Sequence, residues 1–220
     1  MTTITVSKED YLKAIAEAEA EGQTVIPARL AQWLAVTPPA VTFALKRLKR
    51  DGLVTLSGEG RVRLTSPGRE IAERTIVRHH LIERMLFEVF GMPWSEVHDE
   101  AERLEHAVSA TFEKKLAEKL GFKDTCPHGN GLTLRSPMER HKKGYCLVSE
   151  AEIRTRYVVA SVHERDRKLL EFFDQHGIRP GARVVIEERN YDGTLSMRVD
   201  NKAIRIGDAV ADKIWLSKSK

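Results

Sequence analysis

The chain contains 220 residues, of which 41% are hydrophobic, enough to form the cores of two or three small globular domains. No apolar stretch approaches the about 20 residues of a membrane-spanning helix, and the polar first residues resemble neither a secretory signal nor a lipidation site. We therefore expect a cytoplasmic protein with no membrane partner. The net charge is +4, but between Arg29 and Arg63 seven basic residues face two acidic ones, a local excess of the kind that contact with phosphates requires.

The first 70 residues predict a winged helix-turn-helix. Apolar residues recur at helical spacing in three segments, and a turn containing Gly58 and Gly60 joins two short strands. The expected elements are a helix from the N-cap Ser7 to about Gly22, a short helix from Pro27, a helix that is capped by Thr37 and stops at Asp51, and strands 53–56 and 62–64. Helices followed by a β-hairpin wing in this order define the motif.

The rest of the chain predicts a helical region followed by a small β domain. The expected elements are a helix from Ser66 to about Phe90, a helix from about Ser95 to Leu120, a connector over 121–153, strands 158–162, 183–188, 195–199 and 203–206, and a helix over 165–176. The fold class is therefore mainly α with a small β part, an SH3-like barrel. The two cysteines, Cys126 and Cys146, are expected to be ordinary reduced thiols.

The second helix of a helix-turn-helix lies in the major groove, where its N-terminal residues reach base edges. Thr42 could hydrogen-bond a base or present its methyl group to thymine, whereas Phe43 offers only apolar contact. Some winged helices bind only proteins, but the basic region and the arginines of the wing favour DNA. The candidate DNA-binding residues are Arg29, Thr37, Pro39, Thr42, Phe43, Lys46, Arg47, Arg50 and Arg61.

Acidic residues and histidines gather in two segments of the helical region. The residues of each segment lie on one face of a helix, and those of the second segment lie within an arc of about 100° around the helix axis. Burying such a stripe is costly unless a cation compensates its charge, and carboxylate with imidazole suits Mn²⁺ or Fe²⁺, although binding strength alone would favour Zn²⁺. A salt-bridged surface is the alternative interpretation. The sets are His79 with Glu83, and His98 with Glu102, Glu105 and His106.

Together these segments resemble the diphtheria toxin repressor family of iron- and manganese-dependent regulators. The matching residues are Glu9 to Leu12, Val41, Arg47 to Val54, Leu64 to Gly68, His79, Glu83-Arg84, Val97 to Glu102, Glu105-His106, Cys126 to Asn130 and, more loosely, Arg179 to Val184. The resemblance implies a homodimer that binds a palindromic operator on double-stranded DNA. It also implies a winged helix-turn-helix domain (1–70), a helical metal-binding and dimerisation domain (71–140), a linker (141–153) and an SH3-like, FeoA-like domain (154–220).

The resemblance further implies two metal sites. One would use His79, Glu83 and His98 with an acid from the barrel, for which Glu164 and Asp166 are the candidates. The other would use Asp10, Glu102, Glu105 and His106. Because Asp10 and Glu102 stand where iron-type members have methionine and cysteine, the resemblance points to Mn²⁺, with Fe²⁺ as the alternative.

Some residues depart from the family pattern. Lys13 stands where manganese-type members have a second acid, which argues against a closely bridged pair of metal ions. Arg167 lies near an expected ligand position of the barrel, and Phe43 replaces a polar base-contacting residue. We expect His80 to be a bystander and His128 to belong to the connector.

The expected function is that of a repressor, with metal as co-repressor that favours the DNA-competent arrangement of the reading helices. Activation should weaken as pH falls through about 6.5, because histidine ligands must be neutral. A dinuclear carboxylate enzyme is a poor alternative, since no nucleophile motif or phosphate loop is visible. A metal-independent winged-helix regulator is the other alternative.

Overall fold

The computed structural model describes residues 6–121, 123, 125–131 and 134–219. The chain divides into two compact units: Met1–His79 with Leu132–Pro137, and His80–Gly131 with Met138–Lys220. Among the described residues, no helix is both long enough and apolar enough to cross a membrane.

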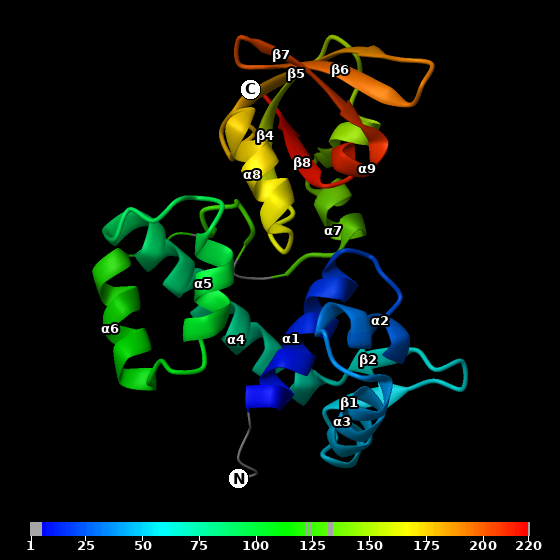
Figure 1. Ribbon diagram of the computed structural model, residues 1–220, viewed down its shortest axis with the longest axis vertical. Helices are drawn as coiled ribbons and strands as arrows, with labels where there is room; N and C mark the ends of the chain where they lie inside the picture. The colour runs from blue at the N-terminus through cyan, green and yellow to red at the C-terminus, as the bar shows by residue number, and fades with distance from the viewer. Residues whose placement is uncertain (1–5, 122, 124, 132–133, 220) are drawn as a thin grey trace. The chain divides into compact units, whose positions relative to one another are not determined.

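The first unit is a winged helix-turn-helix, as predicted (Figure 1). Its elements are α1 (Val6–Ala20), α2 (Pro27–Trp33), α3 (Pro38–Arg50), the antiparallel strands β1 (Val54–Leu56) and β2 (Val62–Leu64), and most of α4 (Ser66–Arg84). Apolar residues at helical spacing bury one stripe of each helix. The fully buried side chains of this core include Leu12, Ile15, Leu30, Val41 and Leu48.

The helix starts differ in detail from the prediction. Because α1 already includes Val6, Ser7 lies inside the first turn and is not its N-cap. Thr37 is the N-cap residue of α3, but its side chain makes no capping hydrogen bond; instead the helix begins with two prolines, whose missing N–H groups need no partner there. The ammonium of Lys8 binds the carboxylate of Asp51 at 2.7 Å, which ties the start of α1 to the end of α3.

The helical part of the second unit contains one more break than predicted. After α4, a π-helical turn (Met85–Val89) is followed by α5 (Val97–Leu104) and α6 (Ala110–Leu120), so the single helix expected over 95–120 was wrong. Ser109 is the N-cap residue of α6, and its hydroxyl accepts a hydrogen bond from the amide of Phe112. The buried Arg84 donates to the carbonyls of Leu120 and Gly121, which joins the end of α6 to α4.

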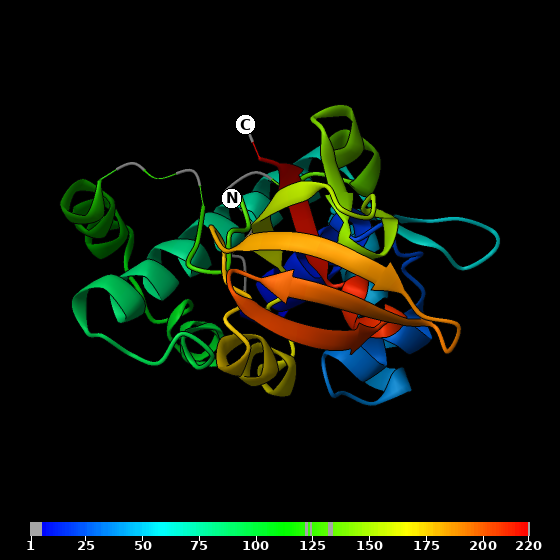
Figure 2. The same cartoon turned by 90° about the horizontal axis from the view of Figure 1, so that it is seen from above.

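The rest of the second unit is built on a six-stranded antiparallel sheet (Figure 2). The order of its strands is β3 (Tyr145–Leu147), β8 (Ile214–Lys218), β4 (Arg156–Val162), β5 (Arg183–Arg189), β6 (Thr194–Val199) and β7 (Lys202–Gly207). Helix α8 (Arg167–Gln175) packs on its core through Leu170 and Phe173. The stretch predicted as a connector contains a helix and a strand, and that strand pairs with the last one of the chain. The other elements are α7 (Pro137–Lys142), a 3₁₀ turn (Val148–Glu150) and α9 (Asp208–Ala211).

Candidate metal centres and DNA-reading surface

Four side chains from three separate segments meet inside the second unit. Glu83 comes from α4, Glu164 follows β4, and Cys126 and His128 come from one turn between α6 and α7. Glu83 and His128 are both 0% exposed, and Cys126 is 5% exposed. We call these four residues the central cluster. Glu164 is partly buried, and two carboxylates so close together and largely shielded from water need compensating positive charge.

The imidazole of His128 lies between the two carboxylates. Its Nδ1 is 3.4 Å from Glu83 Oε1 and 3.4 Å from Glu164 Oε2. Its Nε2 donates to the carbonyl of Trp94 at 3.0 Å, which fixes the ring and turns Nδ1 toward the acids. The Cys126 thiol donates to Glu164 Oε2 at 3.3 Å. Three kinds of metal-binding group therefore face one point.

Two further histidines border the central cluster. His98 Nδ1 is 3.1 Å from Glu83 Oε1, and His80 Nε2 is 3.7 Å from Glu164 Oε1. Ligand atoms of His80, Glu83, Cys126 and Glu164 all lie within 4.8 Å of one another. This donor set of carboxylate, imidazole and thiol fits a divalent transition-metal ion.

The pKa values in the central cluster depend on how its charges and its burial balance one another. Burial alone would lower the pKa of His128, but the carboxylates of Glu83 and Glu164 outweigh it and raise that pKa to about 10. Burial and Glu83 oppose ionisation of Glu164, yet His128 and His80 hold its pKa well below the usual value. Burial raises the pKa of the Cys126 thiol well above its usual value, and Glu164 adds to this. A proton on His128 thus holds the two acids together.

A tight turn brings Cys126 and His128 to the acids. Cys126 and Asn130 pair through their backbones, and the side-chain amide of Asn130 donates to Glu164 Oε2 at 2.7 Å. The His128 carbonyl accepts from the amide of Val162 on β4. Gly129 passes so close to β4 that a Cβ atom there would lie 2.1 Å from the carbonyl oxygen of Ala160.

Replacing Gly129 with alanine should therefore destabilise the second unit and lower its metal affinity. Gly144 has the same positive φ of 83° but open space around it, so Gly144→Ala is a matched control for backbone strain, with an expected cost of about 1–2 kcal/mol. Urea unfolding should show a larger loss for Gly129→Ala. Equal losses for the two variants would contradict the role of the close contact with β4.

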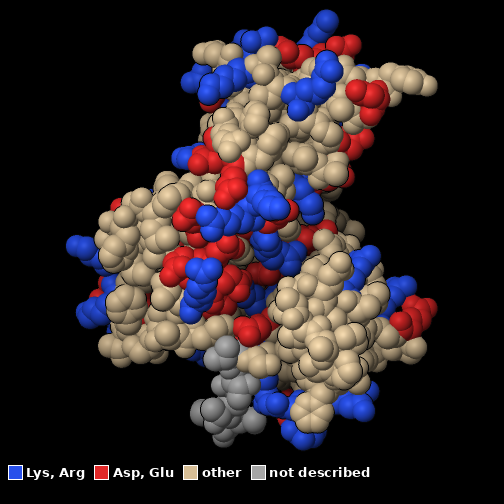
Figure 3. Space-filling view, viewed as in Figure 1, with Lys and Arg blue, Asp and Glu red and all other residues tan. Residues whose placement is uncertain are grey.

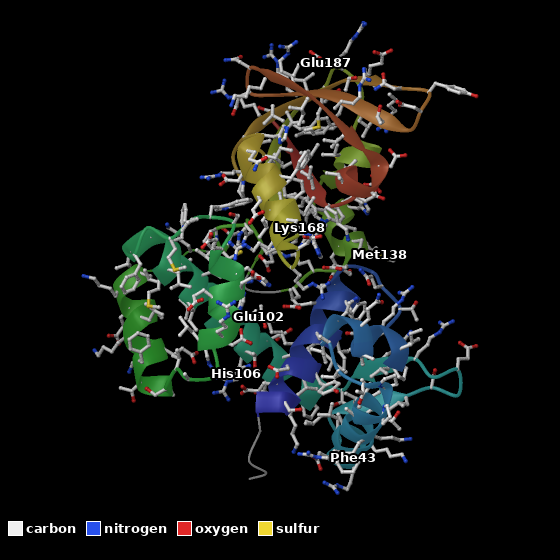
Figure 4. The ribbon with its side chains drawn as sticks, viewed as in Figure 1. Phe43, Glu102, His106, Met138, Lys168 and Glu187 are labelled. Atoms are coloured by element: carbon white, nitrogen blue, oxygen red, sulfur yellow. The ribbon has the colours of Figure 1, made fainter. Side chains whose placement is uncertain are left out.

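The second set of candidate ligands is divided between the units. Glu102, Glu105 and His106 belong to the second unit, on α5 and directly after it (Figure 4). Glu105 is 0% exposed, and its Oε1 is 3.4 Å from His106 Nε2. Asp10 on α1 belongs to the first unit.

His79 lies on α4, one turn before Glu83, at the end of the first unit. There the buried Lys13 ammonium contacts His79 Nδ1 at 3.0 Å. Lys13, which departs from the family pattern, is thus hydrogen-bonded to His79, one of the candidate metal ligands.

Part of the central cluster was not predicted from the sequence. His128 lies in the segment predicted as a connector and Cys126 is a free thiol, both as expected, but these two and the expected bystander His80 all lie beside Glu164. Asp166, the other candidate acid, caps α8 by accepting from the amide of Leu169. The close spacing of Cys126 and His128 was the available signal.

The candidate DNA-binding residues lie on the exposed side of the first unit. Thr37, Pro39, Thr42, Phe43, Lys46 and Arg50 are exposed. Lysine and arginine side chains surround the outer side of α3 (Figure 3). Arg61 lies on the wing, 2.9 Å from Glu59, and Arg29 on α2 donates to the carbonyl of Thr24. An exposed basic helix with a wing is the arrangement that reads a DNA groove.

A winged helix-turn-helix followed by buried carboxylates and imidazoles defines the class of metal-dependent DNA-binding regulators. Three family models match the chain. They are the iron dependent repressor N-terminal DNA binding domain (residues 3–62), the iron dependent repressor metal binding and dimerisation domain (65–132) and the FeoA domain (146–218).

Relatives match over nearly the full chain. The iron-dependent repressor IdeR of Mycobacterium bovis is 35% identical over 99% of this chain and 100% of its own. The diphtheria toxin repressor of Corynebacterium diphtheriae is 30% identical over 99% and 100%. A solved manganese-dependent transcriptional repressor in complex with manganese has a TM-score of 0.87 and 30% identity, over 96% and 100%. The chain belongs to the iron-dependent repressor family of metal-dependent transcriptional repressors.

Proposed function

We propose that the chain is a manganese-activated repressor of metal-homeostasis genes, with iron as the alternative metal, that binds a palindromic operator as a homodimer. The observation that carries this proposal is the central cluster, where the buried carboxylate of Glu83 and the partly buried carboxylate of Glu164 lie beside the imidazole of His128 and the thiol of Cys126. The relatives are repressors rather than enzymes, and we infer that this chain also acts by binding alone. We also propose that the chain has the domains expected from its sequence: a winged helix-turn-helix domain (1–70), a metal-binding and dimerisation domain (71–140), a linker (141–153) and an SH3-like domain (154–220).

The first proposed metal centre is the central cluster with His98 beside it, and His79 is kept as a ligand expected from the sequence. Glu83 and Glu164 supply the negative charge, and His128 presents Nδ1 because the Trp94 carbonyl holds Nε2. A divalent ion would supply the positive charge that the His128 proton supplies otherwise. Because Glu164 follows β4 whereas Glu83 lies on α4, these ligands link the sheet to the helices of the second unit.

The second proposed centre uses Asp10, Glu102, Glu105 and His106. Asp10 lies on α1 of the reading unit, and the other three lie in the unit that contains most of the residues matched by the metal-binding and dimerisation domain. Ligands drawn from both units would fix the orientation of the reading helices within the dimer. Two reading helices must be about one DNA turn apart to bind a palindrome.

Titrating operator affinity against Mn²⁺ tests this proposal. The probe is a duplex selected by the Mn²⁺-loaded protein from a pool with a randomised core of about 20 base pairs. Fluorescence anisotropy should show binding that tightens about a hundredfold with Mn²⁺ and is lost with a chelator. Equal affinity in both conditions would favour the metal-independent regulator.

The protein should release protons when it binds Mn²⁺. His128 carries a proton below a pKa of about 10 and the Cys126 thiol is also protonated, so both must lose a proton to become ligands. Metal affinity at the central cluster should rise with pH up to that pKa, with about two protons released per ion at pH near 7. Calorimetry in two buffers of different ionisation enthalpy measures this number. His128→Gln should lower it by about one; a release near zero in the unmodified protein would contradict the prediction.

A further inference from the structure

The exposed face of α3 carries uncharged residues in its first two turns and charged residues farther along the helix. Val41, Leu45 and Leu48 are buried, which leaves the opposite face to meet a ligand. In the first two turns that face carries Pro39, Thr42 and Phe43; all its charged residues, from Lys46 on, come later. The end of the helix that enters the groove first is therefore almost free of hydrogen-bonding side chains.

The polar group of Thr42 is already engaged. Its hydroxyl donates to the carbonyl of Pro38 at 3.1 Å, so its hydrogen is directed back to the helix. Pro38 and Pro39 have no N–H to offer, and Ala40 has no polar side chain. Direct readout by paired hydrogen bonds, the usual way to identify guanine or adenine, has no side chain to perform it in these turns.

Phe43 is the large side chain of this face and is 66% exposed. It lies on the side of α3 that faces away from α1 and α2 (Figure 4). Lys46, Lys49 and Arg50, exposed farther along the same helix, suit phosphates on either side of a groove. The occupant that fits this surface is a duplex that presents an apolar group in its major groove.

Thymine is the one base that presents a methyl group there. We propose that Phe43 is a specificity-determining residue that recognises the 5-methyl group of a thymine in each half of the operator. This inference rests on the DNA-binding mode of the proposed function. Burial of one methyl group changes affinity about fourfold, so two symmetric contacts should change it about fifteenfold.

The test replaces single thymines by deoxyuridine, which removes the methyl group and keeps the base pairing. The probe is the duplex selected by the Mn²⁺-loaded protein, with deoxyuridine placed at each thymine in turn. At one symmetric pair of positions the substitution should weaken binding of the unmodified protein about fifteenfold. Phe43→Gln should bind the thymine and deoxyuridine duplexes equally, and its own selection should yield a different base at that position.

Lys46→Ala is the matched control on the same helix. It should weaken binding to every duplex and reduce the salt dependence, but keep the preference for thymine over deoxyuridine. Because Phe43 is exposed, the Gln variant should unfold at the same urea concentration as the unmodified protein and bind Mn²⁺ with the same affinity.

The outcomes separate this inference from the function on which it rests. If the Mn²⁺-loaded protein selects a sequence but no deoxyuridine substitution weakens binding, the methyl recognition is wrong and the repressor function stands. If Phe43→Gln keeps the same thymine preference, another residue reads the methyl group and the assignment to Phe43 is wrong. If the Mn²⁺-loaded protein selects no sequence, both proposals fail.

Discussion

Replacing Glu105 with glutamine should remove most of the effect of Mn²⁺ on operator binding. Glutamine keeps the size of the side chain but lacks the charge that a hard cation requires. Glu105 is 0% exposed and its Oε1 lies 3.4 Å from His106 Nε2, so the substitution removes a buried charge beside another candidate ligand. The Mn²⁺-dependent gain in affinity, expected to be about a hundredfold, should fall to a few-fold. Anisotropy titrations of the selected duplex, with Mn²⁺ and with chelator, measure both values.

Glu100→Gln is the matched control for this variant. Glu100 lies on the same helix, α5, but is partly exposed and pairs with Arg103 at 2.8 Å. Such a surface pair contributes little, so this variant should respond to Mn²⁺ as the unmodified protein does. If Glu105→Gln and Glu100→Gln behave alike, Glu105 does not belong to the activating centre. Retained Mn²⁺ binding at the central cluster of both variants would show that the fold is intact.

The winged helix-turn-helix could be predicted because its signals are local. In α3 the apolar residues Val41, Leu45 and Leu48 recur at helical spacing, and the chain turns at Gly52, which has a positive φ of 72°. Neither feature depends on the rest of the molecule. His79 and Glu83 could be placed on one helix face because they are four residues apart within a segment of helical periodicity.

The break between α5 and α6 has a weaker signal. Ser109 caps α6, but the position three residues later is Phe112 rather than a glutamate or glutamine, so the sequence lacks a capping box. Strand β3 is only three residues long, and its partner β8 is about 70 residues away. Such a strand is stabilised by pairing at long range, which periodicity does not reveal.

The central cluster was only half visible from the sequence for the same reason. Glu83 was found by its spacing from His79 on one helix, and Glu164 by its likeness to a family position. Cys126 and His128 become candidates only because the turn at Gly129 packs against β4, a contact between segments about 30 residues apart. A short run of Cys, Pro, His and Gly in an irregular segment indicates a turn, but not what the turn contacts.

Truncation of Trp94 to alanine should cause the largest loss of stability in the second unit. The indole precedes α5 yet belongs to the core of the sheet and is only 3% exposed. Its Nε1 donates to the carbonyl of Pro127 at 2.9 Å, and its ring contacts the guanidinium of Arg179 and the imidazole of His128. One side chain thus joins the helical part, the turn of the central cluster and the sheet.

The expected cost of Trp94→Ala is about 3–5 kcal/mol, because the cavity lies among rigid neighbours that cannot close it. For a unit of this size the unfolding temperature of the metal-free protein should fall by about 10 °C. Trp94→Phe keeps an aromatic ring but loses the hydrogen bond to Pro127 and part of the buried volume, so it should cost less than Trp94→Ala and at least about 1 kcal/mol. Calorimetry in chelator measures both variants. Because the indole contacts the His128 ring and binds the Pro127 carbonyl beside it, the Ala variant should bind Mn²⁺ more weakly at the central cluster. An unchanged unfolding temperature with unchanged Mn²⁺ affinity would show that the sheet and the metal centre do not depend on this side chain.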